Sequence, residues 1–193
     1  EIVGQSGNVH VRSTADISDI AITGNRAYID WQSFNVKSGH TVNFNLNGLN
    51  GVILNRVKGN RISQIDGALN SNGHVYLINP NGLVIGNKGV INATGFTAST
   101  LNLSDSQMKR YVNGEIHTLE FSRSGSAATI ENNGTININN GHLALIGSRV
   151  INAGQINVPG GNAELFAADH VTILHNAPSN PLITVSGTSA IFG

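Results

Sequence analysis

The chain contains no cysteine among its 193 residues. Thiolate metal sites, thiol nucleophiles and any disulfide framework are therefore excluded. Charge is also scarce, because only 11% of the residues are charged, against roughly 25% in typical globular proteins. The formal net charge is zero, so the sequence has no electrostatic footprint for nucleic acid or an anionic membrane. We predict that the chain binds neither.

Long apolar runs and an N-terminal leader are missing as well. No run approaches the ~18 apolar residues of a membrane span, and the opening Glu1–Gln5 has no charged-then-apolar leader. We therefore expect a trimmed segment of a longer protein. The chain is instead polar without charge: asparagine is even more frequent than the 23 glycines, while 39% of residues are hydrophobic. That hydrophobic content is too high for a disordered chain, and neutral amides suit stacked side-chain ladders.

Residues 130–165 contain one pattern twice. The matched positions are Gly134 and Gly154, Ile136 and Ile156, Ile138 and Val158, Gly141 and Gly161, and Leu145 and Leu165. A fixed period of about 20 residues is typical of a solenoid, in which each coil buries its apolar side against its neighbours. Helix signals are nearly absent and strand signals are short. The predicted fold class is therefore all-β: a right-handed parallel β-helix with about 20 residues per coil and three faces.

Recurring Asn-Gly pairs leave one competing fold open. In an antiparallel sandwich or barrel such pairs would mark hairpin turns. A coil that always turns the same way explains the equivalent positions better, and asparagine and glycine both suit its corners. Nine or ten coils, roughly 4.8 Å apart, would account for the whole chain.

We predict one domain over residues 1–193, with two departures from the repeat. Residues 1–45 lack the period and are expected to cap the open N-terminal end, because a solenoid end exposes unpaired strands. Residues 102–126 are expected to leave the helix as a turn or short helix followed by a hairpin. In that segment Ser104 and Gln107 have the spacing of a capping box. Regular coils are predicted over residues 127–175.

The most specific string in the sequence is Asn79-Pro80-Asn81-Gly82-Leu83. By itself it predicts a tight turn, since proline fixes φ and the following Asn-Gly pair accepts positive φ. Further strings accompany it in order: Asp30–Asn35, Asn55–Val57, Ile62–Ile65, Gly67–Leu69, Ser71–Gly82 and Gly95–Leu101. Together they closely resemble the N-terminal secretion domain of two-partner-secretion exoproteins, the haemagglutination-activity domain, and within it the HMW-type adhesins.

The resemblance extends from about residue 5 to about residue 175 and matches the family's Asn-Pro-x-Gly-Ile signature, with Leu83 in place of isoleucine. The second signature of filamentous-haemagglutinin-type members, Asn-Pro-Asn-Leu, is absent. The resemblance implies a β-helix that directs a large adhesin to its outer-membrane TpsB-type transporter, whose POTRA domains would recognise Asn79–Leu83. It also implies passage through the periplasm to the bacterial surface, and a host-cell or matrix receptor bound by the full-length protein.

Catalytic and metal sites are not expected. His74 and His142 occupy equivalent repeat positions, which favours a shared structural place over metal binding, and no cofactor is predicted. Two alternatives remain open: a carbohydrate-active β-helix enzyme, which would need clustered carboxylates on one face, and a domain with direct adhesive or haem-acquisition activity. The basic residues Arg56, Lys58 and Arg61 are predicted to lie on a solvated edge. Candidate N-glycosylation sequons begin at Asn92, Asn102 and Asn133.

Overall fold

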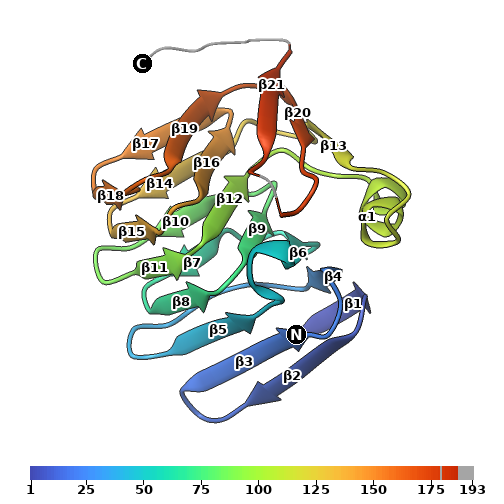
Figure 1. The fold of residues 1–193 in the computed structure, drawn as a ribbon. Coiled ribbons are helices and arrows are strands. Elements are labelled where there is room, and N and C mark those ends of the chain that lie inside the picture. The colour runs from blue at the N-terminus through green and yellow to red at the C-terminus, as the bar shows by residue number, and fades with distance from the viewer. Residues whose placement is uncertain (179, 187–193) are drawn as a thin grey trace.

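The computed structural model describes residues 1–178 and 180–186, and it confirms the predicted right-handed parallel β-helix with three faces (Figure 1). The repeat corresponds to strands stacked in register. Ile136 lies opposite Ile156, and Leu145 lies opposite Leu165. The match between residues one coil apart therefore reflects side chains that pack directly on one another in the core.

Each face is a sheet whose neighbouring strands come from successive coils. The first, which we call the covered face, contains β1 (Ile2–Ser6), β4 (Arg26–Trp31), β6 (Val52–Val57), β9 (His74–Ile78), β12 (Gly95–Ser99), β16 (His142–Gly147) and β19 (Asn162–Ala167). The second, the asparagine face, contains β2 (Val9–Ser13), β3 (Ile17–Ile22), β5 (Thr41–Asn45), β8 (Ala68–Ser71), β11 (Val90–Ala93), β15 (Thr135–Ile138) and β18 (Gln155–Asn157). The short face contains β7 (Ser63–Ile65), β10 (Leu83–Ile85), β14 (Thr129–Asn132) and β17 (Arg149–Asn152). A 3-10 turn, η1 (Gly48–Asn50), precedes β6.

A separate layer packs on the outside of the covered face. It consists of α1 (Asp105–Val112) and a small antiparallel sheet of β13 (Thr118–Ser122), β20 (His170–Leu174) and β21 (Leu182–Val185). We call these four elements the covering layer; Figure 1 shows them on one side of the stacked coils. The predicted short helix is present, and Ser104 begins it by accepting a hydrogen bond from the Gln107 amide. The predicted hairpin is wrong, because β13 pairs with β20 and not with an adjacent strand.

The number of coils is smaller than the nine or ten expected from the sequence. The longest stack has seven strands. Side chains that bond along the asparagine face are separated by 24, 27, 22, 45 and 20 residues in successive steps. Most coils are thus longer than 20 residues, and the wide interval contains α1 and β13. The solenoid is shorter because part of the chain builds the covering layer.

Two hydrophobic cores hold these layers together. The first lies inside the coils and includes Phe44, Leu77, Phe96 and Leu145. The second lies between the covered face and the covering layer, where Tyr76 meets α1 and β13. Strand β6 is buried at all six positions, because it has a core on each side. The strand therefore lacks the alternation of a half-buried strand, although Asn55 and Arg56 are among its buried residues.

The two ends of the coil stack differ. At the N-terminal end, β1 pairs antiparallel with β4 and β2 pairs antiparallel with β3, whereas β3 and β4 already pair in parallel with β5 and β6. At the other end, Leu165 stacks next to Leu145 as the last residue of a row of core side chains. It is 43% exposed, against 0% for Leu145. None of the helices in the described part of the chain is long and apolar enough to cross a membrane.

Candidate functional site

The Asn79–Leu83 segment forms the corner between β9 and β10. The Gly82 amide donates to the carbonyl of Asn79 over 3.0 Å, and the Asn81 amide donates to Asn79 Oδ1 over 3.0 Å. Gly82 has a φ of 123°, a conformation that side chains disfavour. The turn predicted from the sequence is therefore present. It is closed by the main chain and by the asparagine side chain at its first position.

The asparagine side chains of this corner bind the loop of residues 58–62. Asn79 is buried, and its Nδ2 donates to the Arg61 carbonyl over 3.0 Å and to Ser63 Oγ over 2.9 Å. Asn81 Nδ2 donates to the Gly59 carbonyl over 2.9 Å. Leu83 is buried in the inner core, while Pro80 is half-buried. The polar groups of the motif are thus engaged within the domain.

The basic run predicted to lie on a solvated edge is divided by the structure. Lys58 and Arg61 are exposed, but Arg56 is 2% exposed, so the prediction is wrong for Arg56. Its guanidinium forms two hydrogen bonds to Asp30, of 2.8 and 2.9 Å. It also donates to Asp105 Oδ1 over 2.6 Å and to the Leu103 carbonyl over 2.7 Å. Arg56 therefore fastens the start of α1 to the covered face.

Electrostatics at Arg56 favour the charged pair. Burial would lower the pKa of Arg56, but the hydrogen bonds that Arg56 donates to Asp30 and Asp105, together with the attraction of the two carboxylate charges, outweigh it, and the pKa is raised. The hydrogen bond from Arg56 lowers the pKa of Asp105. Sequence reasoning missed this role because the guanidinium's partners at the start of α1 are distant in sequence: Leu103 is 47 residues away and Asp105 is 49 residues away.

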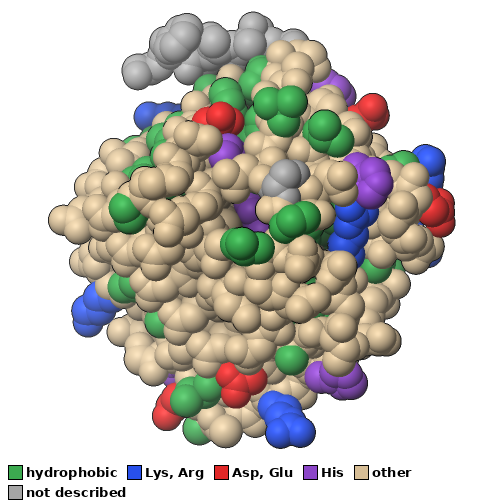
Figure 2. Space-filling view, in the orientation of Figure 1, with side chains coloured by type: hydrophobic (Ala, Val, Ile, Leu, Met, Phe, Trp, Pro, Cys, Tyr) green, Lys and Arg blue, Asp and Glu red, His purple; other side chains and the backbone are tan. Residues whose placement is uncertain are grey.

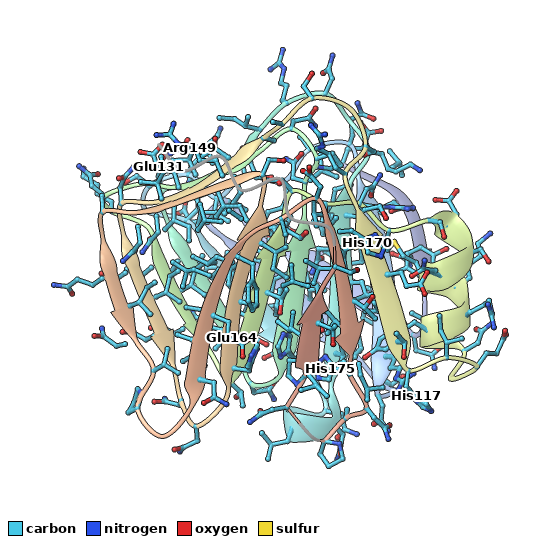
Figure 3. The ribbon with its side chains drawn as sticks, turned by 90° about the horizontal axis from the view of Figure 1, so that it is seen from above. His117, Glu131, Arg149, Glu164, His170 and His175 are labelled. Atoms are coloured by element: carbon cyan, nitrogen blue, oxygen red, sulfur yellow. The ribbon has the colours of Figure 1, made fainter. Side chains whose placement is uncertain are left out.

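Three buried histidines lie between the covered face and the covering layer. His74 and His142 come from β9 and β16. His175 follows β20 and is labelled in Figure 3. His74 Nε2 lies 2.8 Å from Thr97 Oγ1, and His175 Nδ1 lies 2.8 Å from the Tyr76 hydroxyl. We call His74, His142 and His175 the histidine cluster. His74 and His175 thus make polar contacts inside an otherwise apolar interface.

Burial is the main cause of the altered acidities in this interface. It lowers the pKa of His175 to about 4 and lowers the pKa of His74 and His142. His142 Nε2 lies 3.5 Å from Glu164 Oε2, but neither ring nitrogen of His142 has a hydrogen-bond partner among the described residues. The cluster is therefore neutral at pH 7. Within residues 1–178 and 180–186, no three His, Cys, Asp or Glu side chains are placed to hold a metal ion.

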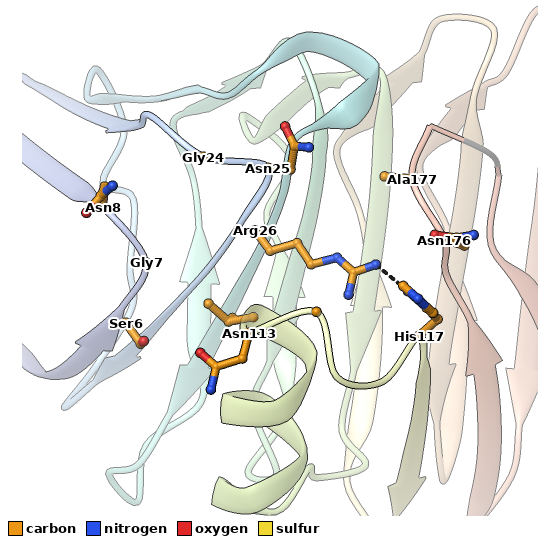
Figure 4. A pocket seen from close by; sticks show the side chains of 12 residues that line it. Ser6, Gly7, Asn8, Gly24, Asn25, Arg26, Asn113, His117, Asn176 and Ala177 are labelled. Atoms are coloured by element: carbon orange, nitrogen blue, oxygen red, sulfur yellow. Dashed lines mark hydrogen bonds between the residues drawn. The ribbon is translucent and has the colours of Figure 1, made fainter.

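A cavity of about 520 Å³ lies where the N-terminal turns meet the end of α1 (Figure 4). Its cation is Arg26, which donates to the carbonyls of Tyr111 and Ile116 over 2.8 and 3.0 Å. The guanidinium also lies 2.7 Å from His117 Nδ1 and 4.1 Å from the centre of the Tyr111 ring. Arg26 is thus a brace between β4 and the covering layer, with its NH1 and NH2 groups engaged by the protein.

The sequon asparagines are not grouped around the Asn79–Leu83 corner. Asn92 lies on β11 of the asparagine face, where its Nδ2 donates to Asn70 Oδ1 over 3.0 Å. Asn102 Oδ1 accepts from the Leu103 amide over 3.0 Å. Asn133 follows β14 and donates to Glu131 Oε1 over 2.8 Å. Each therefore serves a local structural contact.

Charged side chains are sparse on the face shown in Figure 2, where most of the surface is neutral. Lysine, arginine, aspartate and glutamate are scattered on it and do not form a patch of one sign. This face has no array of carboxylates suited to sugar hydrolysis, which would place two such groups across one bond.

Comparison with known proteins places these features in a family. The TPS secretion domain family matches residues 3–192. Two heme/hemopexin-binding proteins of Haemophilus influenzae are similar, one 41% identical over 92 residues and the other 36% identical over 134 residues. These matches cover 48% and 66% of this chain, but only 10% and 14% of the relatives.

A solved structure extends the similarity to the whole fold. The crystal structure of the HMW1 secretion domain from Haemophilus influenzae is similar with a TM-score of 0.85 and 36% identity. The match covers 98% of this chain and 50% of that one. The matching family and the fold are those of a secretion domain and not of an enzyme family. The chain belongs to the TPS secretion domain family, the secretion modules of two-partner-secretion exoproteins.

Proposed function

We propose that this domain targets its parent exoprotein to a cognate outer-membrane TpsB-type transporter by binding the transporter's POTRA domains before it folds. The observation that carries the proposal is the match to TPS secretion domains over residues 3–192. In the folded domain the asparagines of Asn79–Leu83 are bonded internally and Leu83 is in the core. A partner that reads these side chains therefore needs the unfolded segment.

A strand-addition mechanism fits this requirement. An extended segment that joins the edge of a POTRA sheet gains main-chain hydrogen bonds, and its alternate side chains supply specificity. Residues 74–85 contain two strands separated by the turn, so the segment has extended-chain preference on both sides of the motif. Folding would then withdraw Asn79 and Leu83 from the transporter and release the chain after it has crossed from the periplasm to the cell surface.

Binding to purified POTRA domains tests the recognition step. We expect a peptide of residues 68–90 to bind and the folded domain to bind at least tenfold more weakly. Asn79→Ala in the peptide should weaken binding about tenfold, because at least one good contact with the POTRA domain would be lost. Asn87→Ala is the matched control, since Asn87 is exposed and lies outside the motif. Equal affinities for all three peptides would remove the role of the motif.

Secretion of a fused passenger tests the targeting function. We expect the passenger to reach the medium when the domain and the cognate transporter are both present, and to stay in the periplasm when either is missing. Secretion that continues without the transporter would contradict the proposal.

We also propose that the folded domain nucleates the β-helix of the parent protein outside the cell. Support comes from the C-terminal end of the stack, where Leu165 is 43% exposed and, among the described residues, β17, β18 and β19 each pair with one strand only. A coil added there would bury this surface and extend all three faces. Because each coil packs on the previous one, folding in this direction disfavours return through the transporter.

Binding of a host ligand is proposed for the whole protein and not for this domain. The chain spans 10% and 14% of the heme/hemopexin-binding relatives, and its histidine cluster is buried. Titration of the 193-residue chain with hemin or hemopexin is expected to give no binding. A saturable interaction would assign that activity to the secretion domain. N-glycosylation at Asn92, Asn102 or Asn133 is likewise a proposal, to be tested by mass spectrometry of the secreted protein.

A further inference from the structure

Six side chains form a continuous hydrogen-bonded row along the asparagine face. They lie at directly paired positions of six strands, and are Asp19, Asn43, Asn70, Asn92, Asn137 and Asn157. Each asparagine Nδ2 donates to the side-chain oxygen of the residue one coil closer to the N-terminus. The five distances, in chain order, are 2.9, 3.0, 3.0, 2.9 and 2.8 Å. We call this row the asparagine ladder.

The chemistry of Asp19 fixes the direction of the ladder. An ionised carboxylate has only acceptors, whereas an amide has a donor side and an acceptor side. Asn43 must therefore turn its Nδ2 toward Asp19, which leaves its Oδ1 facing Asn70. For the same reason each following asparagine must turn its Nδ2 toward the preceding residue of the ladder and its Oδ1 toward the next. One acid on β3 thus orients five amides on the six strands from β3 to β18.

The other end of the ladder is an open acceptor. Asn157 donates to Asn137 Oδ1 over 2.8 Å, so its own Oδ1 points away from the stack. Asn157 is exposed and lies on β18, an edge strand. Among the described residues no donor reaches Asn157 Oδ1. The edge that would receive another strand therefore presents an acceptor of fixed orientation.

We propose that the asparagine ladder makes this edge selective: the strand that adds beside β18 has to place a hydrogen-bond donor, such as an asparagine amide, over Asn157, and an acidic side chain there is excluded. The occupant is the next coil of the same, longer polypeptide. The chain spans half of the solved secretion domain, and the exposed core residue Leu165 lies at the same end. The inference rests on the proposed nucleating function and names what the added coil must carry.

The direction of the ladder is tested within the 193-residue chain by a double-mutant cycle. In Asn92→Asp, Asn70 and Asn43 must reverse to donate toward the introduced carboxylate, and Asn43 Oδ1 then faces Asp19. We expect the unfolding equilibrium constant to rise about tenfold, which corresponds to about 1.4 kcal/mol. In the Asp19→Asn background the reversed ladder is complete, because the amide introduced at that position can donate, and the change should be less than about threefold.

Charge repulsion alone could mimic this rescue, so two controls separate the effects. The two positions are three strands apart, about 14 Å, where additivity is the norm. The rescue should persist in about 1 M salt, where the screening length is about 3 Å. Asn87→Asp, an exposed position outside the ladder, should show no dependence on Asp19. Additive effects of Asn92→Asp and Asp19→Asn, or a rescue lost in high salt, would overturn the fixed direction.

Selectivity at the edge is tested by extending the chain with one further coil that carries either asparagine or aspartate over Asn157. Hydrogen exchange of the β18 amides should be at least tenfold slower with asparagine than with aspartate. Equal protection, or dimerisation of the unextended chain through β18, would overturn the inference. Transporter-dependent secretion of both extended chains is measured in parallel. A failure there would contradict the targeting function, whereas the ladder cycle and the exchange result would stand.

Discussion

Replacing Asn79 with alanine tests whether the motif corner is a structural clamp. The side chain is buried and makes four hydrogen bonds: it donates to Arg61 and Ser63 and accepts two from Asn81. Each bond contributes about 1 kcal/mol net, and a buried group left without a partner costs ~1–3 kcal/mol. Ser63 is fully buried and loses its partner, whereas Arg61 and Asn81 reach water. We expect Asn79→Ala to lower the free energy of unfolding by about 3 kcal/mol.

Asn81→Ala is the matched comparison within the same corner. It removes donations to Gly59 and to Asn79 Oδ1, but it leaves both buried donations of Asn79 in place. Because Asn81 is half-buried, the loss should be about 1 kcal/mol. Asn87→Ala, in an exposed position outside the corner, should be near neutral.

Urea unfolding followed by tryptophan fluorescence measures these differences. The chain has one tryptophan, Trp31, whose ring packs edge-on against Phe34 with centroids 5.4 Å apart. The dependence of the free energy on urea should be the same in all variants, since the surface exposed on unfolding does not change. If Asn79→Ala remains within about 1 kcal/mol of the parent, or matches Asn81→Ala, the corner does not act as a clamp.

Three further outcomes are expected. Arg56→Met leaves Asp30 without its partner inside the protein and should lower the free energy of unfolding by about 3 kcal/mol. Asp105→Asn, at the exposed end of the network, should lower it by less than about 1 kcal/mol. Equal losses in chemical denaturation would refute the role of Arg56 in holding α1 to the covered face. The lowered pKa values of the histidine cluster mean that the unfolded chain binds more protons below about pH 6.5. Stability should therefore be full above that pH and fall by about 1.4 kcal/mol per pH unit per histidine toward the pKa of His175, about 4; thermal melts that do not change between about pH 7 and about pH 5 would contradict this. A β-carbon at Gly95 would lie 2.2 Å from His74 Nδ1, so Gly95→Ala should destabilise by about 2 kcal/mol; the double variant with His74→Ala should lose less than the sum of the two single losses in the same assay.

The coil and its register were predictable because they depend on residues close to one another in sequence. Ile136 with Ile156 and Leu145 with Leu165 were matched by pattern alone and are direct neighbours in the stack. The turn at Asn79 and the helix start at Ser104 follow from local backbone chemistry in the same way. The number of coils was overestimated, because a period read from residues 130–165 does not reveal where the chain leaves the solenoid.

The covering layer was not predictable from local pattern. β13 pairs with β20, and Phe121 lies opposite Val171, a contact that no repeat or turn signal encodes. The burial of Arg56 and of the histidine cluster follows from that layer. A strand that looks half-exposed from its sequence becomes fully buried once a second element docks on its outer side, and docking depends on complementary surfaces from distant segments.

The sequence by itself determined a parallel β-helix, its repeating apolar positions and its membership of a secretion-domain family, since the period and the motif strings are local and ordered along the chain. Only the tertiary structure decided which polar side chains face inward, which end of the stack stays open and how the amides of the asparagine ladder are oriented. These properties arise from stacking. A single asparagine has no preferred direction, but a row that ends on Asp19 has one, because a carboxylate can only accept.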